Sequence, residues 1–473
     1  MPTRLRLALA ACLLGPLAAR AAEPAPGIPP PPNIILCMAD DMGWGDTGYN
    51  GNRVLRTPHL DEMARAGVQF NRFYAAAPVC SPTRGSCLTG RHPYRLGITY
   101  ANDGVLLARE ITLPQLLHAR GYATGHFGKW HLGTLSRTQL DSNRGGRPQW
   151  AQFYAPPWER GFETCFSTES QIPNWDPMKD QAVSPTHYFT GADQIVTDNL
   201  EGDDSRVIMD RAIPFIRESV KAGRPFLAVI WFHTPHAPVV AGPAYRQRYE
   251  QEDEDHQHYY GAVTALDEQM GRLRAELKAL GIEGNTMLWF TSDNGPAAKG
   301  GGPGPLPGGR QQGVTGGLKG RKGSLHEGGI RVPGILVWPD RYPAHQVIES
   351  PAVTSDYLPT VMAALGLKRA TIPAELDGID LLPLLDGRQP RRDAGIGFES
   401  VKEFAYIDGD YKLYSADRGQ TWQLYNLAAD RGENKDLAAT EPARLQDMEQ
   451  RFTRWRASVT RDKEASLAAF GER

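Results

Sequence analysis

Short apolar runs alternate with helical patterns along most of the chain, and this alternation most limits the folds available to it. The runs are rich in β-branched and aromatic residues and are too uniformly apolar for either face of a strand to meet water. The expected strands are 33–38, 122–127, 226–232, 285–291 and 334–338. The expected helices are 59–67, 205–223, 259–280 and 355–365. The sequence therefore predicts an α/β fold with a large, mostly parallel central sheet flanked by helices on both faces.

The pattern changes after about residue 390. Segments 394–398, 403–415 and 421–427 predict short antiparallel strands, with an Asp-Gly turn inside the second segment and a last helix around 441–458. We therefore expect a main domain over residues 23–389 and a smaller C-terminal α+β subdomain over residues 390–473.

Residues 1–22 have the features of a secretory signal peptide. Two arginines precede an apolar run that ends near Ala19, and small residues follow it. The run is too short to predict a membrane span. The stretch ending at Cys12 resembles a lipoprotein cleavage site, but the apolar run continues past it, so ordinary cleavage near Ala21 or Ala22 is favoured. The sequence predicts a periplasmic or secreted protein without stable membrane insertion.

The charges give no sign of a nucleic-acid partner. The formal net charge of the 473 residues is −2, and the charged residues are scattered along the chain. Proteins that bind nucleic acid present a basic surface. We therefore expect no nucleic-acid partner.

Four cysteines lie beyond the expected signal peptide, an even count that would permit two disulfides in an exported protein. Cys37 lies within an apolar strand and is expected to be a small buried hydrophobe, and Cys87 is expected to pack within a helix. These contexts argue against disulfides. Cys80 is different, because it precedes Pro82 just ahead of an expected helix start, with Arg84 one turn inside the helix. Such helix starts attract anions.

Polar side chains follow four of the expected strands at their carboxyl ends, which is where open α/β sheets bind ligands. In chain order they are Asp40 and Asp41, Lys129 and His131, His233 and His236, and Asp293 and Asn294. Each residue type is also common in caps and turns, but four strand ends together indicate one site. The acids and the amide offer only oxygen ligands, which suit Ca²⁺ or Mg²⁺ better than zinc. Ca²⁺ is favoured because it tolerates irregular geometry.

The segment CSPTRGSCLTGR (80–91) resembles the signature of the type I sulfatases, an arylsulfatase-like family of the alkaline phosphatase superfamily. That signature is Cys-x-Pro-Ser/Thr-Arg followed by Leu-Thr-Gly, and Thr83 stands where Ser is commoner. The segment GYATGHFGKWHLG (121–133) is similar to the second signature of the family. Four more segments look like family segments in the family's order: 33–52, 233–238, 291–295 and 318–333. The resemblance runs from about Asn33 to Leu385 and is weaker beyond.

The resemblance implies a sulfatase catalytic domain that hydrolyses sulfate monoesters. A formylglycine-generating enzyme would convert Cys80 to formylglycine, whose hydrate would attack sulfur and give a covalent sulfo-enzyme intermediate. One Ca²⁺ would be bound by Asp40, Asp41, Asp293, Asn294 and the modified Cys80.

The resemblance also assigns the remaining roles. Arg84 would hold the hydrate, and Lys129 and Lys322 would bind the sulfate group. His131 would contact the hydrate, and His236 would face the leaving group. Lys322 is favoured over Lys319, and His236 over His233, by their places within the family segments.

The substrate and two alternatives stay open. A small-molecule or oligosaccharide sulfate ester is expected and a carbohydrate sulfate favoured, with steroid and aryl sulfates as other choices. The aromatic residues of 149–180 are expected either to stack on sugars or to pack the surface. A phosphatase or phosphodiesterase on this fold would need a Ser or Thr nucleophile and transition metals, which the sequence does not clearly offer. A non-catalytic receptor for sulfated glycans is the alternative if Cys80 stays a thiol.

Overall fold

The computed structural model describes residues 30–142, 144–179, 185–297 and 312–471. The expected signal peptide, residues 1–22, lies outside these ranges. By their contacts, residues Pro31–Arg473 form one compact unit. The division at residues 389 and 390 stays a prediction.

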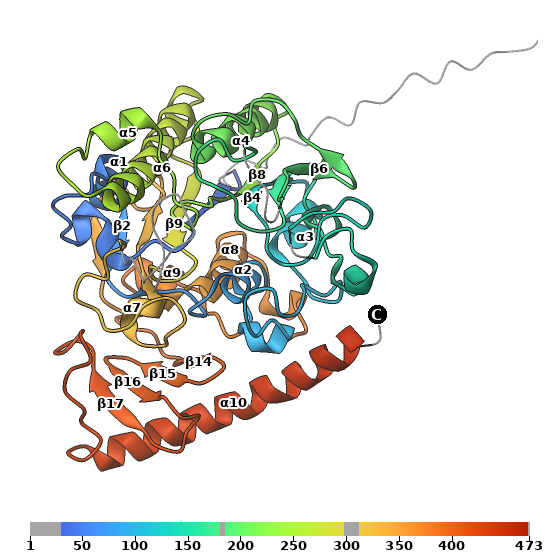
Figure 1. The fold of residues 1–473 in the computed structure, drawn as a ribbon. Coiled ribbons are helices and arrows are strands. Elements are labelled where there is room, and N and C mark those ends of the chain that lie inside the picture. Colours follow the sequence, from blue (N-terminus) through green and yellow to red (C-terminus); the bar gives the residue numbers. More distant parts are fainter. Residues whose placement is uncertain (1–29, 143, 180–184, 298–311, 472–473) are drawn as a thin grey trace, which may run out of the picture. The chain divides into compact units, whose positions relative to one another are not determined.

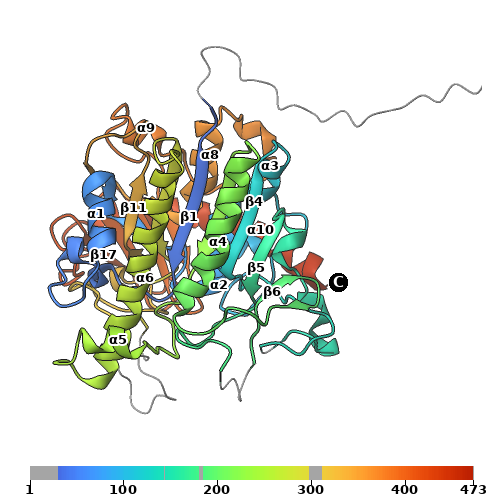
Figure 2. The same ribbon diagram turned by 90° about the horizontal axis from the view of Figure 1, so that it is seen from above.

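The central sheet contains ten strands. Their bounds are β1 Asn33–Ala39, β2 Val68–Phe70, β4 Ala123–Lys129, β5 Thr164–Thr168, β6 Phe189–Gly191, β7 Gln194–Ile195, β8 Phe226–Trp231, β9 Thr286–Ser292, β11 Gly334–Val337 and β12 Gln346–Ile348. The strand order is β12-β2-β11-β9-β1-β8-β4-β5-β6-β7 (Figures 1 and 2). The five strands from β9 to β5 are parallel throughout. The four parallel strands that were expected to bear the polar rim are therefore neighbours.

The prediction of a mostly parallel sheet is confirmed for this centre, while both edges are mixed. The expected strand 334–338 exists as β11, but it runs antiparallel to β9 and to β2. Parallel neighbours need a long crossover, usually a helix. Between β9 and β11, the only helix among the described residues is the four-residue α7 (Glu327–Ile330), so β11 starts from the end of the sheet at which β9 stops.

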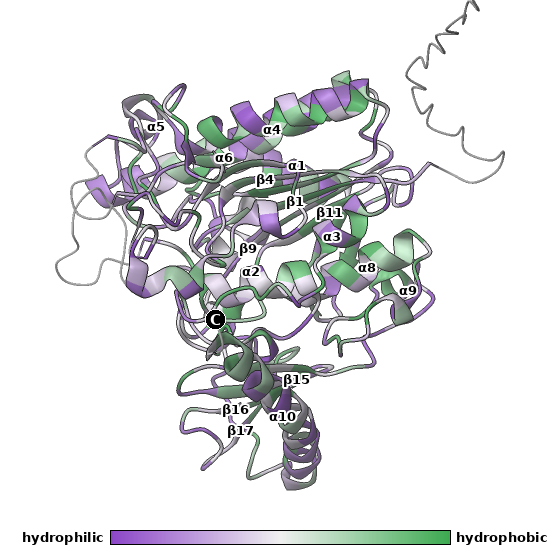
Figure 3. Ribbon diagram, turned by 90° about the vertical axis from the view of Figure 1, so that its right-hand side faces the viewer, coloured by the Kyte–Doolittle hydropathy of each residue, from purple (hydrophilic) through white to green (hydrophobic). Residues whose placement is uncertain are grey.

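Helices cover both faces of the sheet. The other bounds are α1 Pro58–Ala66, α2 Cys80–Thr89, α3 Leu113–His118, α4 Asp204–Lys221, α5 Pro243–Gln247, α6 Glu254–Ala279, α8 Tyr357–Ala364 and α9 Leu382–Leu385. Alternate residues of β1 belong to two cores: Ile34 and Leu36 pack with α2, α3 and α8, whereas Ile35 and Cys37 pack with α1, α4 and α6. Figure 3 shows hydrophobic residues along the sheet and hydrophilic ones interspersed along α4. This arrangement is the predicted two-faced burial.

Shorter elements complete the main part. A three-stranded sheet has the order β10-β3-β13, with β3 Phe73–Tyr74, β10 Arg331–Val332 and β13 Ala352–Val353. The 3-10 helices are η1 Trp44–Asp46, η2 Gly48–Asn50, η3 Pro93–Leu96, η4 Pro148–Phe153, η5 Pro157–Glu159, η6 Thr354–Asp356 and η7 Arg369–Thr371.

The C-terminal part is an antiparallel sheet with one long helix, as predicted. Its elements are β14 Ile396–Glu399, β15 Phe404–Asp408, β16 Tyr411–Ser415, β17 Gln423–Asn426 and α10 Pro442–Gly471. Within β15, Phe404 and Tyr406 pack against α10, whereas Ala405 and Ile407 face residues of the main part such as Tyr74. The helix continues well past the expected end near residue 458 (Figure 1).

The cysteines and the aromatic segment have clear structural outcomes. Cys37, Cys80, Cys87 and Cys165 are free and buried, which confirms that none of them is in a disulfide. In the aromatic-rich segment, Phe153, Tyr154, Phe162 and Phe166 are buried, so these rings pack the interior. Among the described residues, no helix combines the length and apolarity needed to cross a membrane.

Candidate active site

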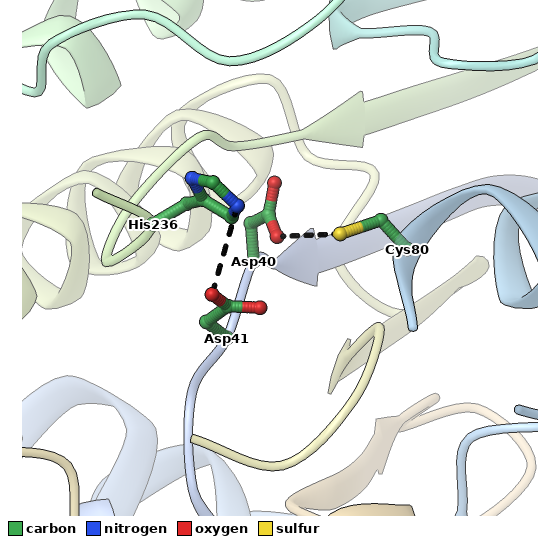
Figure 4. Close-up of side chains that lie close together, drawn as sticks. All are labelled: Asp40, Asp41, Cys80 and His236. Carbon is green, nitrogen blue, oxygen red and sulfur yellow. Dashed lines mark hydrogen bonds and ion pairs between the residues drawn. The ribbon is translucent and has the colours of Figure 1, made fainter. Parts of the chain in front are cut away.

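Neighbouring strand ends bring the predicted acids together, and Figure 4 shows two of them, Asp40 and Asp41, beside Cys80 and His236. Asp40 and Asp41 directly follow β1, and Asp293 and Asn294 directly follow β9. The Asp41 backbone has a left-handed φ of 68°, a conformation that Asp tolerates better than most residues. Its N–H donates to Asp293 Oδ1 at 3.1 Å, and Asn294 Nδ2 donates to Asp41 Oδ1 at 2.7 Å. The two strand ends therefore hold each other in register.

Three basic side chains face the three acids. Lys129 Nζ, at the end of β4, lies 2.5 Å from Asp40 Oδ2. The guanidinium of Arg84 lies 2.7 Å from Asp293 Oδ2 and 3.3 Å from Asp40 Oδ2. Lys322 Nζ lies 2.7 Å from Asp41 Oδ1. The charges of the six side chains balance.

The crowding of the acids changes their proton affinity. Burial, together with the negative charge of Asp40, raises the pKa of Asp293 to about 7 despite its pairing with Arg84. Burial also disfavours the charged form of Asp40, but Lys129 and its other cationic neighbours outweigh it and hold the pKa of Asp40 well below its usual range. A bound cation would relieve the repulsion that raises the pKa of Asp293.

Cys80 is the first residue of α2, whereas we had expected it just ahead of the helix. The helix begins earlier because Pro82 is its third residue, and proline fits anywhere in a first turn, where backbone N–H groups have no helical partner. Cys80 Sγ donates to Asp40 Oδ1 at 3.4 Å, and the residue is only 2% exposed. Burial, and then the charge of Asp40, raises the pKa of the thiol, so the unmodified side chain is a poor nucleophile.

The side chains around Asp40 can hold a metal ion. One ligand atom from each of Asp40, Asp41, Cys80 and His236 lies within 4.8 Å of the others. The buried Asn294 Oδ1 has no hydrogen-bond partner among the residues that the structure describes, so it is available as a further oxygen ligand. The surplus of oxygen donors fits a hard cation such as Ca²⁺. The two oxygens of Asp293, also expected as a ligand, presently accept from Arg84 and from the Asp41 N–H.

His236 joins this group, and His233 does not. His236 Nε2 lies 3.7 Å from Asp41 Oδ2, while its Nδ1 donates to the Ala237 carbonyl at 2.7 Å. Burial and the charge of Lys322 lower the pKa of His236 to about 4. Both ring nitrogens of the fully buried His233 are engaged, at 2.8 Å from Asp204 Oδ2 and 2.7 Å from Thr168 Oγ1, which is a structural role.

His131 is oriented by a residue that we did not predict. Its Nε2 lies 3.0 Å from Asn102 Oδ1, an acceptor, so Nε2 carries the hydrogen and Nδ1 has a free lone pair. Nδ1 is buried and has no partner in the described part of the chain. Burial and then Lys129 lower the pKa of His131 well below its usual range. The ring is therefore a neutral base at pH 7.

The Asn102 loop is itself held in place. The Asn102 N–H donates to Ser81 Oγ at 3.3 Å, and Arg144 donates to the Asn102 carbonyl at 2.9 Å. Asn102 and His131 both have left-handed backbones, with φ of 62° and 57°. Their proximity left no signal in the sequence, because Asn102 lies in a loop 29 residues before His131.

Of the two lysine candidates, only Lys322 contacts the acids of the site. Lys322 reaches Asp41, whereas Lys319 lies over the ring of Tyr425 and donates to the Glu433 carbonyl at 3.5 Å. Nine of the ten predicted site residues are thus joined by hydrogen bonds and ion pairs, with Arg84 bound to the acids rather than to Cys80, and His131 lies near enough for Lys129, Arg84 and Asp40 to affect its pKa.

Comparison with known proteins identifies similar sequences. The family model described as Sulfatase matches residues 32–367. Steryl-sulfatase of Mus musculus is 33% identical over 457 residues, covering 83% of this chain and 71% of that protein. N-acetylgalactosamine-6-sulfatase of Sus scrofa is 33% identical over 422 residues, covering 85% of this chain and 75% of that protein.

Solved structures are similar as well. The structure of Ps i-CgsB in complex with k-i-k-neocarrahexaose has a TM-score of 0.77 and 25% identity, and covers 93% of this chain and 98% of that chain. Phosphonate monoester hydrolase of Agrobacterium radiobacter has a TM-score of 0.64 at 20% identity, over 90% of this chain and 96% of that chain, which shows a shared fold alone.

Proposed function

The chain belongs to the sulfatase family and is a sulfuric ester hydrolase, and from this premise we propose that it is an exported, periplasmic or secreted enzyme that acts on a sulfated carbohydrate. We further propose that Cys80 is converted to formylglycine by a formylglycine-generating enzyme, and that one Ca²⁺ completes the site.

The setting of Cys80 carries the proposal. Its Sγ lies against Asp40, beside three acids and three basic side chains, in a place where a thiol has little reactivity. A buried cysteine used only for packing would lie among apolar groups. An oxygen function at this position would lie within reach of the same carboxylates and would suit a hard cation.

A carbohydrate substrate is supported by two of the relatives. One is named as a sulfatase of N-acetylgalactosamine, and the Ps i-CgsB structure holds a neocarrahexaose. Steryl-sulfatase is equally similar in identity, so a steryl sulfate is the competing substrate to be tested.

The charges of the site suit a sulfate ester. Without a metal ion the acids and bases balance, and the bound Ca²⁺ would add positive charge that stabilises the oxygens of the sulfate group. Lys129 and Lys322 would move part of their interaction from Asp40 and Asp41 to those oxygens. Arg84 keeps Asp40 and Asp293 in position.

The two histidines would move the protons. The free Nδ1 of His131 is placed to accept a proton, and the hydrogen bond from Nε2 to Asn102 keeps that lone pair available. His236 would donate from Nε2 to the departing alcohol, once the negative charge of the bound sulfate favours its protonated form.

Peptide mass spectrometry and a substrate panel test the proposal together. We expect the peptide containing residues 80–84 to carry an aldehyde in place of the thiol. We expect turnover of position-defined sulfated sugars to exceed turnover of steryl sulfates and phosphate monoesters. A fully active preparation with an intact Cys80 thiol would refute the formylglycine, and activity confined to steryl sulfates would refute the carbohydrate substrate.

Replacement of the cysteine sharpens the test. Cys80→Ala should abolish turnover while leaving thermal unfolding nearly unchanged, because alanine fits the space of the thiol. Cys87→Ala, in the same helix and equally buried, is the matched control and should keep its activity. Full activity in Cys80→Ala would contradict the assigned nucleophile.

A further inference from the structure

A cavity of about 340 Å³ lies between the main part and the C-terminal sheet. It is lined by Ala77, Pro78, Val79, Thr99, Tyr100, Gly323, Glu399, Ser400, Val401, Lys402 and Glu403. The last five of these residues form the end of β14 and the connection to β15, so the C-terminal sheet supplies one whole wall.

This cavity adjoins the candidate active site. Val79 directly precedes Cys80, Gly323 directly follows Lys322, and Tyr100 is two residues before Asn102. The side chains of Lys322 and His236 are 21% and 17% exposed, while those of Asp40 and Arg84 are fully buried. The site is therefore open on the side of Lys322, next to the cavity wall.

The cavity is lined by exposed large apolar side chains, which are few among the described residues. Among the described residues, seven large apolar side chains are exposed, and two of them, Tyr100 at 48% and Val401 at 58%, line this one cavity. Aromatic rings with free faces bind the apolar faces of sugar rings through the same contacts by which they pack in cores.

Among the described residues that line the cavity, the one basic side chain, Lys402, is unpaired. Glu399 pairs with Arg418 at 3.1 Å and Arg456 at 3.2 Å, and Glu403 accepts the N–H of Leu325. Lys402 is exposed and has no ion pair or hydrogen bond within the described ranges. An anion entering the cavity would meet an uncommitted lysine, a Glu399 whose charge is offset by two arginines, and a Glu403 whose carboxylate is hydrogen-bonded to Leu325 and Ser324.

We propose that this cavity binds the sugar next to the one that carries the scissile sulfate. The ring of Tyr100 contacts the face of that sugar, and Lys402 pairs with a sulfate or carboxylate group on it. The inference rests on the proposed function and adds that the preferred substrate is an anionic oligosaccharide rather than a monosaccharide sulfate.

Lys402→Gln tests the charge recognition. The substrates are two disaccharides with the same target sulfate, one with an anionic neighbouring sugar and one with a neutral neighbouring sugar. The ratio of kcat/KM for the anionic to the neutral disaccharide should fall by about 3- to 10-fold in Lys402→Gln, mainly through KM, as for a partly exposed charged hydrogen bond. Lys368→Gln, at an exposed lysine after α8, is the matched control and should keep the wild-type ratio.

Tyr100→Ala tests the contact with the sugar ring. It should lower kcat/KM for both disaccharides relative to the monosaccharide sulfate by about 2- to 10-fold, which corresponds to the loss of one aromatic contact. Tyr100→Phe keeps the ring and should restore the wild-type preference.

The outcomes separate this inference from the proposed function. Disaccharides with a sulfated and with a carboxylated neighbour distinguish the two sources of the anion. A wild-type enzyme that hydrolyses sugar sulfates, with a ratio that Lys402→Gln leaves unchanged, would overturn the inference and leave the proposed function standing. A wild-type enzyme with no activity on any sugar sulfate would overturn the proposed function itself.

Discussion

At the scale of single residues, Asp293 shows that the fold brings buried acids close enough to repel one another when no cation is bound. It lies buried against Asp40 and Asp41, and its pKa is raised to about 7. Arg84 compensates only part of the repulsion, since it is shared with Asp40. The buried Asn294 Oδ1 beside it lacks a partner among the described residues. Both features fit the metal ion proposed for this site.

Asp293→Ala should lose the bound calcium and nearly all activity, because it removes a ligand and leaves Arg84 without its main partner. Elemental analysis of the purified protein measures the first effect, and turnover of a sulfated sugar the second. Asp293→Asn keeps the side-chain volume and a hydrogen bond, so its free energy of unfolding should lie closer to that of the wild type. It should still lose the bound calcium. Zinc in the wild-type protein, with activity restored only by zinc, would contradict the assignment.

His236→Ala should slow sugar sulfates more than activated aryl sulfates. A sugar alkoxide needs a proton as it departs, whereas a nitrophenolate leaves without one, so the loss on the sugar sulfate should be about 10²- to 10⁴-fold and far smaller on the aryl ester. Single-turnover release of the alcohol measures the effect. Equal slowing of both esters would argue against a proton donor at this position.

His131→Ala is the comparison for the same experiment. Loss of the His131 ring should slow the release of inorganic sulfate. Because this step follows the departure of the alcohol, its rate should fall by the same factor for both esters. A dependence on the leaving group in His131→Ala would mean that the two histidine roles are exchanged.

At the scale of elements, a buried ionic cluster joins the C-terminal sheet to α7. Lys412, in β16 and fully buried, lies 3.0 Å from both Glu327 Oε1 and Glu433 Oε1. Tyr74 donates to the other oxygen of Glu327 at 2.9 Å. Glu327 follows Lys322 by five residues, so the cluster also steadies the segment that carries Lys322.

Lys412→Met should lower the free energy of unfolding by about 3–5 kcal/mol, because it leaves two buried carboxylates without their cation. Denaturant unfolding measures the change, and Lys435→Met, at an exposed lysine, is the control that should change it little. A loss below about 1 kcal/mol would mean that the cluster is hydrated.

The same cluster predicts a pH dependence. Burial disfavours the charge on Glu433, but Lys412 outweighs burial and holds the pKa of Glu433 at about 2. Since this value lies below that of an unfolded glutamate, the stabilisation is complete above about pH 4.3 and is lost as the pH falls towards 2. The loss of stability over this range should be smaller in Lys412→Met than in the wild type.

The strands differ in how well the sequence predicts them. Apolar runs located β1, β4, β8 and β9 within a residue or two, because burial on both faces leaves a continuous signal. The direction of β11 could not be predicted, since it depends on how the chain reaches the sheet and not on the strand itself. The strands β5, β6 and β7, at one end of the sheet order, were missed because they are short and bear many polar residues.

The sequence predicted the positions of the site residues only in part. Asp40, Asp41, Asp293 and Asn294 meet as expected because they directly follow neighbouring parallel strands, whereas Cys80 lies in the first turn of α2 and His233 is engaged elsewhere. The positions of Asn102 and of Nε2 in His236, which lies 3.7 Å from Asp41 Oδ2, depend on loops, whose paths follow from tertiary packing. The cavity beside Lys402 was equally beyond reach, since it forms only where the C-terminal sheet meets the main part.

At the scale of the whole molecule, α10 runs along the C-terminal sheet (Figure 1) and contacts η3, which follows α2 in the chain. Its first half covers the C-terminal sheet through Phe452. In its second half Asp462 lies 2.7 Å from Arg91 and 2.9 Å from Arg95. Helix propensity alone did not reveal this second half, because its buried residues are few and its partners lie far away in the sequence.

Asp462→Asn should lower the free energy of unfolding by about 1.5–3 kcal/mol, as for the loss of hydrogen bonds between charged groups. It should also speed hydrogen exchange in η3, Pro93–Leu96, against which this half of the helix packs. Asp447→Asn, in the same helix but in an exposed pair with Arg451, should cost less than about 1 kcal/mol. Equal effects of the two variants would mean that the second half of α10 is not firmly docked.

The burial of Cys80 bears on whether the proposed oxidation of its side chain comes before or after folding. Its Sγ is shut between α2 and the end of β1, where no second enzyme can reach it once these elements have met. If Cys80 is converted to formylglycine, as proposed, the oxidation would therefore have to come before folding, and a chain that folds first would keep its thiol. Under that proposal, the active fraction of a preparation would depend on the rate of oxidation relative to the rate of folding, and exposing the folded protein to a converting enzyme would not raise it.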